Sequence, residues 1–136
     1  MKNIVVIDLN VFVRALLTSG ADKVIYNTIK AGKITPAFCP DMFKNLADVL
    51  IRPHLKLGIR DVKEVLTIIK DNALVIKPEI KITACRDASD NIILETAAAC
   101  NSKAIVTNDA DLLILNPFRN IPIVNSRKFL ELLKDM

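Results

Sequence analysis

Short apolar runs alternate along this chain with segments of helical periodicity, and this alternation constrains the fold more than any other feature. The first run, IVVI at residues 4–7, is β-branched throughout, and further extended segments are expected at residues 34–38, 73–76, 104–107 and 121–124. Runs that are apolar at every position, rather than at alternate positions, indicate strands covered on both faces. The sequence therefore predicts an α/β fold with a central parallel sheet.

Helical patterns occupy most of the intervals between these strands. Gly20 and Gly32 are expected to mark the ends of the first two helices, and Pro40 is expected near the first turn of the third. Apolar spacing places Leu17 on the inner face of the first helix and Val24 on the inner side of the second. Residues 78–86 are expected to form a loop. Helices are expected at residues 10–19, 22–31, 40–51, 59–71, 88–100 and 126–134.

Length and composition are typical of one globular domain spanning residues 1–136. The chain has 136 residues, of which 51% are hydrophobic, and no apolar run approaches the roughly 18 residues of a membrane span. Neither a signal peptide nor a membrane partner is expected. The net charge of +4 permits a polyanionic partner without requiring one. Three cysteines without metal-ligand spacing indicate a reduced, cytoplasmic protein.

Carboxylates follow the predicted strands at one edge of the sheet. Asp8 directly follows the first strand, Asp109 lies two residues beyond the strand at 104–107, and Asp90 lies at the start of the helix at 88–100. Because the carboxyl ends of parallel strands share an edge, these three side chains are expected to converge there. Crowded carboxylates repel one another unless a cation compensates their charge. Oxygen ligands of this kind suit Mg²⁺ or Mn²⁺.

The same residue types also occur as helix caps, which is a simpler explanation for each of them taken singly. Asp87 and Asp90 have the spacing of a capping box, and Asn108 and Asp111 have the same spacing before a short helix. Asp8 could cap the helix that starts near residue 10. The capping interpretation accounts for the acidic residues one at a time, but it does not explain why several of them come together at one edge.

Two further titratable residues have unremarkable expected positions. Glu95, one turn beyond Asp90, is expected to point to solvent, and the single histidine, His54, is expected in a loop. No His or Cys cluster provides a zinc site. A divalent ion held by carboxylates can activate water and neutralise phosphate charge, so the expected substrate is a phosphodiester. Arg14 and Arg86 are candidates for holding its phosphates, although both could equally be solvated side chains.

Several segments together resemble PIN-domain proteins. VVIDLNVFVRALL resembles the opening of that family, in which a strand ends in Asp and Asn follows two residues later. RDASDNIILETAAACNSKAIVTNDADLLIL resembles its second half, with an acidic cluster opening a helix before a strand, Thr and two Asp. FRNIPIVNSRKFLELL and LADVLIRPHL are similar to segments of the subfamily assigned as toxins of toxin–antitoxin pairs, near the VapC-type toxins. The resemblance covers nearly the whole chain.

This resemblance implies a three-layer α/β/α sandwich and a Mg²⁺- or Mn²⁺-dependent endoribonuclease acting on single-stranded RNA. It also implies a cognate antitoxin and a homodimer as partners. Asn10 would orient the Asp8 loop or a water at the metal. The acidic site of the family carries over to metal ligands at Asp8, Asp90 and Asp109, with Asp87 and Asp111 as supporting carboxylates.

One position departs from the family pattern. The family has Glu in the helix before the Arg-Pro pair, and this chain has Asn45 there. Loss of a charged ligand weakens binding of a divalent cation. Asp41 and Asp48 lie on the same helix face and could substitute, although Asp41 is also a plausible helix-start residue. A second hypothesis is therefore a weakened or inactive PIN-like domain that binds RNA or a partner protein.

A third hypothesis is an enzyme of another class. The segment DLNVF at a strand end is loosely similar to the start of haloacid-dehalogenase-type phosphatases, whose first Asp is a nucleophile. That family has Asp two residues later and then a nearby Thr, whereas this chain has Asn10 and Phe12. A P-loop or dinucleotide-binding fold is excluded because no glycine-rich loop follows the first strand.

Overall fold

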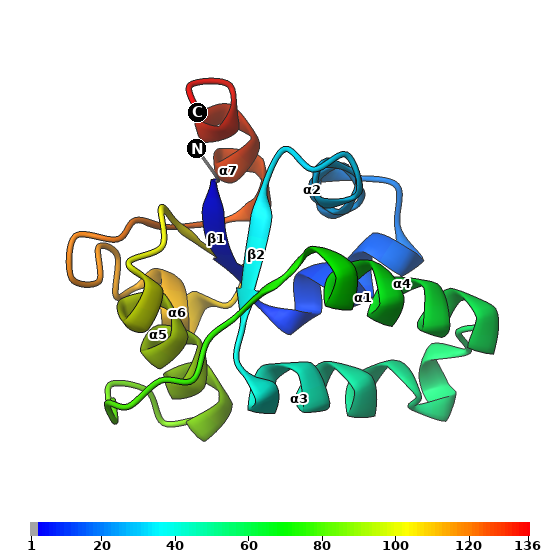
Figure 1. Cartoon of the computed structure of the whole chain (residues 1–136), viewed down its shortest axis with the longest axis horizontal. Helices are drawn as coiled ribbons and strands as arrows, with labels where there is room; N and C mark the ends of the chain where they lie inside the picture. The colour runs from blue at the N-terminus through cyan, green and yellow to red at the C-terminus, as the bar shows by residue number, and fades with distance from the viewer. Residues whose placement is uncertain (1–2) are drawn as a thin grey trace.

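The computed structural model describes residues 3–136 as a parallel sheet enclosed by helices (Figure 1). Five strands form the sheet in the order β3-β2-β1-β4-β5, and every neighbouring pair is parallel. The last three strands in the sequence are two residues long, which is shorter than predicted. The strands are β1 Ile4–Ile7, β2 Thr35–Phe38, β3 Leu74–Val75, β4 Ile105–Val106 and β5 Ile123–Val124.

Helices cover both faces of this sheet, which confirms the predicted α/β/α sandwich. In Figure 1, α5 and α6 lie on one side of β1 and β2, whereas α1, α2 and α4 lie on the other. The third helix, α3, begins below the end of β2 in this view and contacts both α1 and α5. The helices are α1 Leu9–Leu17, α2 Ala21–Lys30, α3 Pro40–Leu50, α4 Ile59–Asn72, α5 Ala88–Cys100, α6 Ala110–Leu113 and α7 Ser126–Leu133, with a 3₁₀ helix at Pro53–Leu55.

The strand order places a crevice between β1 and β4. Connections from β1 lead outward to β2 and β3, and the connection through α5 then returns past β1 to β4. Ligands in open parallel sheets bind where the strand order reverses, outside the carboxyl ends of the strands. The register pairs Ile7 with Val106, so that Asp8 and Thr107 follow side by side. The backbone nitrogen of Asp8 donates to the Val106 carbonyl oxygen at 2.9 Å.

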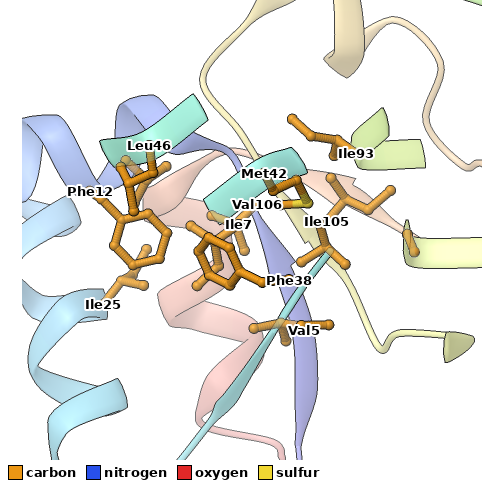
Figure 2. Close-up of a cluster of buried hydrophobic side chains, with 14 of the residues drawn as sticks. Val5, Ile7, Phe12, Ile25, Phe38, Met42, Leu46, Ile93, Ile105 and Val106 are labelled. Carbon is orange, nitrogen blue, oxygen red and sulfur yellow. The ribbon is translucent and has the colours of Figure 1, made fainter. Parts of the chain in front are cut away.

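The core lies between the sheet and the helices around it. β1 is buried from Val5 to Ile7, as its unbroken apolar run predicts. The rings of Phe12 and Phe38 lie 5.7 Å apart, and Met42 of α3 packs in the same cluster (Figure 2). A fully buried side chain of this size contributes roughly 1.5–3 kcal/mol relative to an exposed one. This packing makes the end of β1 a rigid base for the residue that follows it.

Two predictions about helix faces and ends are wrong. Leu17 and Val24 are 51% and 44% exposed, because 100° per residue rotates each of them away from the buried face of its helix. The first helix ends at Leu17, before Gly20, and Gly20 is instead the N-cap residue of α2. Gly32 does end the second helix, with a positive φ of 76°.

No helix within residues 3–136 combines the length and apolar composition needed to cross a membrane.

Candidate active site

Asp8 links the first strand, the first helix and the neighbouring strand. It is the N-cap of α1, where its Oδ1 accepts from the Asn10 backbone nitrogen at 3.4 Å. The other oxygen, Oδ2, accepts from the Thr107 hydroxyl at 2.7 Å, across the crevice between β1 and β4. The capping role considered for Asp8 is therefore present. It uses only one carboxylate oxygen, and the buried side chain faces the edge where β4 ends.

Asp109 is placed by the same threonine. Its backbone nitrogen donates to Thr107 Oγ1 at 3.1 Å, so that one hydroxyl connects the loops that carry Asp8 and Asp109. Asp109 is also the N-cap of α6, with Oδ1 accepting from the Asp111 backbone nitrogen at 2.9 Å. The alternative in which Asn108 caps this short helix is wrong, because the helix begins one residue later than that spacing requires.

Asp90 lies in the first turn of α5 and is 8% exposed. Burial, followed by the negative charges of Asp109 and Asp8, raises the pKa of Asp90 to about 6. The preceding Asp87 caps the helix, accepting from the Ser89 nitrogen at 3.0 Å and hydroxyl at 2.7 Å. These bonds lower the pKa of Asp87. The capping alternative therefore holds for Asp87, whereas Asp90 is directed inward towards the other carboxylates.

The pKa shifts of Asp8 and Asp90 both include the charge of Asp109. Burial raises the pKa of Asp8 although the Thr107 hydroxyl opposes the shift, and Asp109 raises it further. The nearby Cys85 thiol also has a raised pKa, first from burial and then from the charges of Asp90 and Asp109. The active-site hollow, of about 420 Å³, opens beside the cluster. It is lined by Asp8, Asn10, Val13, Arg14, Asn108 and Asp109.

The other predicted site residues lie at the edge of this cluster. Asn10 is exposed on the hollow, and Asp111 is exposed beside Asp109. Arg86 pairs with Asp111 at 3.7 Å, but its side chain is almost fully exposed, so the pair contributes little to stability. Arg14 lines the hollow and pairs with Asp22 at 3.0 Å. The two arginines therefore differ, since only Arg14 is held in place by a buried partner.

Glu95 is one of the acidic candidates in the sequence, and the alternative in which it simply points to solvent is wrong. Glu95 is buried, and its Oε2 accepts from the Ile82 backbone nitrogen at 2.9 Å. Asn91 makes a similar contact, accepting from the Cys85 nitrogen at 2.8 Å and donating to the Cys85 carbonyl at 3.0 Å. Both side chains on α5 therefore fasten the loop before it. This anchoring holds the start of the helix that carries Asp90.

Asn45 lies half-buried on α3, which contacts α5. Its side chain makes no hydrogen bond to any group in the described part of the chain. The two candidate substitutes, Asp41 and Asp48, are exposed, and Asp41 occupies the first turn of α3 as a helix-start residue would. The neutral amide at position 45 is therefore not compensated by a buried carboxylate on the same helix.

Asp22 is a buried carboxylate that was not identified from the sequence. It is 5% exposed on α2, and its Oδ2 accepts from Arg14 Nε at 3.0 Å. Its Oδ1 accepts from Asn108 Nδ2 at 3.3 Å and from the Ser126 hydroxyl. A signal was present, because Asp22 lies one turn before the buried Ile25 on the same helix face. An acidic residue in an inward position requires partners elsewhere in the fold.

The donor set of the acidic cluster suits a hard divalent cation. All the candidate ligands are carboxylate oxygens, and two of the three have pKa values raised by burial and mutual repulsion. Oxygen donors with excess negative charge favour Mg²⁺ or Mn²⁺ over softer metals. As the side chains stand, no three His, Cys, Asp or Glu groups among residues 3–136 are placed to hold a metal ion together. The assignment of Asp8, Asp90 and Asp109 as metal ligands therefore stays a prediction.

Comparisons with known proteins agree with this architecture. The crystal structure of PAE2754 from Pyrobaculum aerophilum is similar, with a TM-score of 0.62 and 12% sequence identity over 99% of this chain and 91% of that one. At this identity the likeness concerns the fold. No curated protein matches the sequence significantly. A family model described as "PIN domain" matches residues 4–111, and the chain therefore belongs to the PIN-domain family, a nuclease superfamily.

Proposed function

We propose that the chain is a divalent-metal-dependent endoribonuclease that cleaves single-stranded RNA beside Asp8, Asp90 and Asp109. The observation that carries the proposal is the Thr107 hydroxyl, which donates to the Asp8 carboxylate and accepts from the Asp109 backbone nitrogen, so that both residues are held at one edge of the sheet. Burial and the charges of Asp109 and Asp8, which raise the pKa of Asp90 to about 6, support it. Crowded carboxylates without a neutralising side chain destabilise a fold, and such groups are typical of functional sites. Membership of a nuclease superfamily supports a nuclease role in general, and PIN nucleases generally use divalent metals.

Each residue of the site has a role in this proposal. Asp8, Asp90 and Asp109 would hold Mg²⁺ or Mn²⁺, and the ion would supply activation of water and neutralisation of phosphate charge. Thr107 fixes the Asp8 carboxylate and the Asp109 backbone through one hydroxyl. Asp87 and Asp111 add negative charge at the exposed edge. Arg14 reaches into the active-site hollow, where it would hold a backbone phosphate of the substrate.

The second candidate function is a PIN-like domain that binds RNA or a protein with weak or no cleavage. The observation that favours it is Asn45, a neutral side chain where the family has Glu, with only exposed carboxylates on the same helix. Family membership supports neither candidate over the other. It does weigh against the phosphatase hypothesis, in which Asp8 would be a nucleophile.

The biological role that we propose is that of the toxin of a toxin–antitoxin pair in the cytoplasm. A cognate antitoxin and a second copy of the chain would then be its partners. Support comes from the resemblance of FRNIPIVNSRKFLELL and LADVLIRPHL to toxin-like PIN sequences. Co-purification with a protein encoded beside the chain's gene, and the mass of the isolated chain in solution, test these two partners separately.

Cleavage of end-labelled single-stranded RNA tests the proposed activity. Wild type, Asp8→Asn and Asn45→Glu are compared in Mn²⁺, Mg²⁺ and EDTA, with the exposed Asp48→Asn as the control variant. We expect cleavage by wild type and Asp48→Asn that disappears in EDTA and in Asp8→Asn. Cleavage by Asn45→Glu alone would establish the second candidate instead. Cleavage by Asp8→Asn at the wild-type rate, with the fold intact, would show that the site is wrongly assigned.

A further inference from the structure

The active-site hollow lies next to a second hollow, with which it shares two lining residues. The second one has a volume of about 480 Å³ and shares Arg14 and Asn108 with the first. It lies between the N-terminal ends of α2 and α7. We call it the α2–α7 hollow. It is lined by Arg14, Thr18, Gly20, Ala21, Asp22, Asn108, Asn125, Ser126 and Arg127.

The α2–α7 hollow has the opposite charge character to the acidic cluster beside it. Arg14 and Arg127 both line it, and both are exposed. Its only acidic residue is Asp22, whose two carboxylate oxygens accept from Arg14, Asn108 and Ser126. The α2 helix begins there at Ala21, and its N-cap residue, Gly20, has no side chain to cap the first backbone N–H groups. The hollow therefore offers cationic and N–H donors, with its one carboxylate already bound.

Arg14 is oriented for a ligand that spans both hollows. Its Nε donates to Asp22 at 3.0 Å, which fixes the plane of the guanidinium group. Its two Nη groups donate to no acceptor within residues 3–136, and guanidinium groups bind phosphate through such paired donors. Arg127 forms no ion pair in the same described range. Two cationic side chains thus extend from the acidic cluster into the second hollow.

We infer that the α2–α7 hollow binds the phosphate next to the cleaved one in a single strand of RNA. The strand would run from Asp8 and Asp109 past Arg14 towards Arg127. The inference rests on the proposed function, and it adds the direction of the strand and a residue, Arg127, that binds it. Arginine and backbone donors contact phosphate without reading bases, so binding in this hollow is independent of sequence.

Binding of a fluorescent oligouridylate in EDTA, followed by anisotropy at several salt concentrations, tests this inference. The variants are Arg127→Ala, Arg127→Lys and the adjacent control Lys128→Ala, which removes the same charge from α7 outside the hollow. We expect Arg127→Ala to weaken binding several-fold and to reduce the slope of log K against log salt by about 0.7, the value for one phosphate on a single strand. Arg127→Lys is expected to keep the slope, and Lys128→Ala to leave it unchanged.

Arg86→Ala completes the test, because Arg86 pairs with Asp111 and does not line the α2–α7 hollow. If Arg86→Ala lowers the slope and Arg127→Ala does not, the strand does not pass through the α2–α7 hollow and the inference is overturned. Equal effects of Arg127→Ala and Lys128→Ala, or no binding by wild type, also overturn it. Cleavage in Mn²⁺ is measured separately. Normal binding with the expected slopes but no cleavage by wild type would contradict the proposed function and leave the RNA path in place.

Discussion

Two buried carboxylates, Asp22 and Asp90, occupy the first turns of α2 and α5, yet their surroundings differ. Asp22 is neutralised by Arg14 and accepts from two neutral donors. Asp90 has no cationic partner in the described residues and faces two further carboxylates. The difference separates a carboxylate that holds the fold together from one that the fold retains at a cost in stability.

The residues that follow β4 connect Asp22 and its partners with the acidic cluster. Asn108 donates to Asp22 and accepts from the Ser126 nitrogen at 3.2 Å, whereas its neighbour Asp109 belongs to the acidic cluster. Two consecutive residues therefore belong to groups with opposite roles. Asp22 and its hydrogen-bond partners fix the loop after β4, and this loop holds Asp109 close to the other two carboxylates. Preorganisation of this kind allows a site to remain charged and crowded before its cation binds.

The largest change in stability is expected from removing the Asp22 carboxylate, whose charge Arg14 neutralises. Asp22→Ala removes the acceptor shared by Arg14, Asn108 and Ser126, and we expect the free energy of unfolding to fall by about 3 kcal/mol. The figure is moderate because water can solvate the partly exposed Arg14. Urea unfolding measures it. Asp61→Ala is the matched control, an exposed acid in the first turn of α4, with an expected loss below about 1 kcal/mol. Equal losses would contradict the role given to Asp22.

Removing a negative charge from the acidic cluster is expected to stabilise the fold instead. The pKa of Asp90 is about 6 when folded against an ordinary value of 3.8, so the folded state binds the proton more tightly. Stability from this group is therefore present below about pH 4 and is lost as the pH rises through 6. In EDTA at pH 7, Asp90→Asn should raise the free energy of unfolding by about 2–3 kcal/mol. The gain should disappear at pH 4, and a gain that persists there would contradict the electrostatic explanation.

Much of the framework follows from the sequence because it is encoded locally. The unbroken run at Ile4–Ile7 and the pattern of α5, whose ends at Ala88 and Cys100 agree with prediction, need only neighbouring residues. The convergence of Asp8, Asp90 and Asp109 also follows, since parallel strands bring their carboxyl ends to one edge. Their role as metal ligands stays a prediction.

The remaining features depend on partners distant in the chain. Asp22 contacts Asn108 and Ser126, which are 86 and 104 residues away, so its neutralisation has no local signature. Glu95 is satisfied by a backbone nitrogen in an irregular loop, which no periodic pattern describes. The two-residue strands β3–β5 are also shorter than their apolar runs, because pairing with neighbours rather than composition sets their ends.

A smaller effect is expected at the hydroxyl that joins the loops. Thr107→Val removes the hydroxyl that donates to Asp8 and accepts from the Asp109 nitrogen. We expect the free energy of unfolding to fall by about 2 kcal/mol, because one of these bonds involves a charged group. Thr107→Ser should recover most of it. The matched control is Thr96→Val, which removes one buried hydroxyl bonded to a helix carbonyl at 2.8 Å. A loss in Thr107→Val no larger than that in Thr96→Val would show that the bridge to Asp8 is unimportant.

The smallest effect concerns Asn45, on the helix α3 that contacts α5. Asn45→Glu adds negative charge on α3, so it should intensify the repulsion without metal and relieve it with metal. We expect Mn²⁺ to bind about tenfold more tightly, or about 1.4 kcal/mol, measured as the rise in Tm with Mn²⁺ concentration. Asn45→Gln has the same length without the charge and should bind as wild type does. Equal Mn²⁺ affinities for the two variants would place position 45 outside the metal site. The absence of Glu at this position would then be no reason to regard the nuclease as inactive.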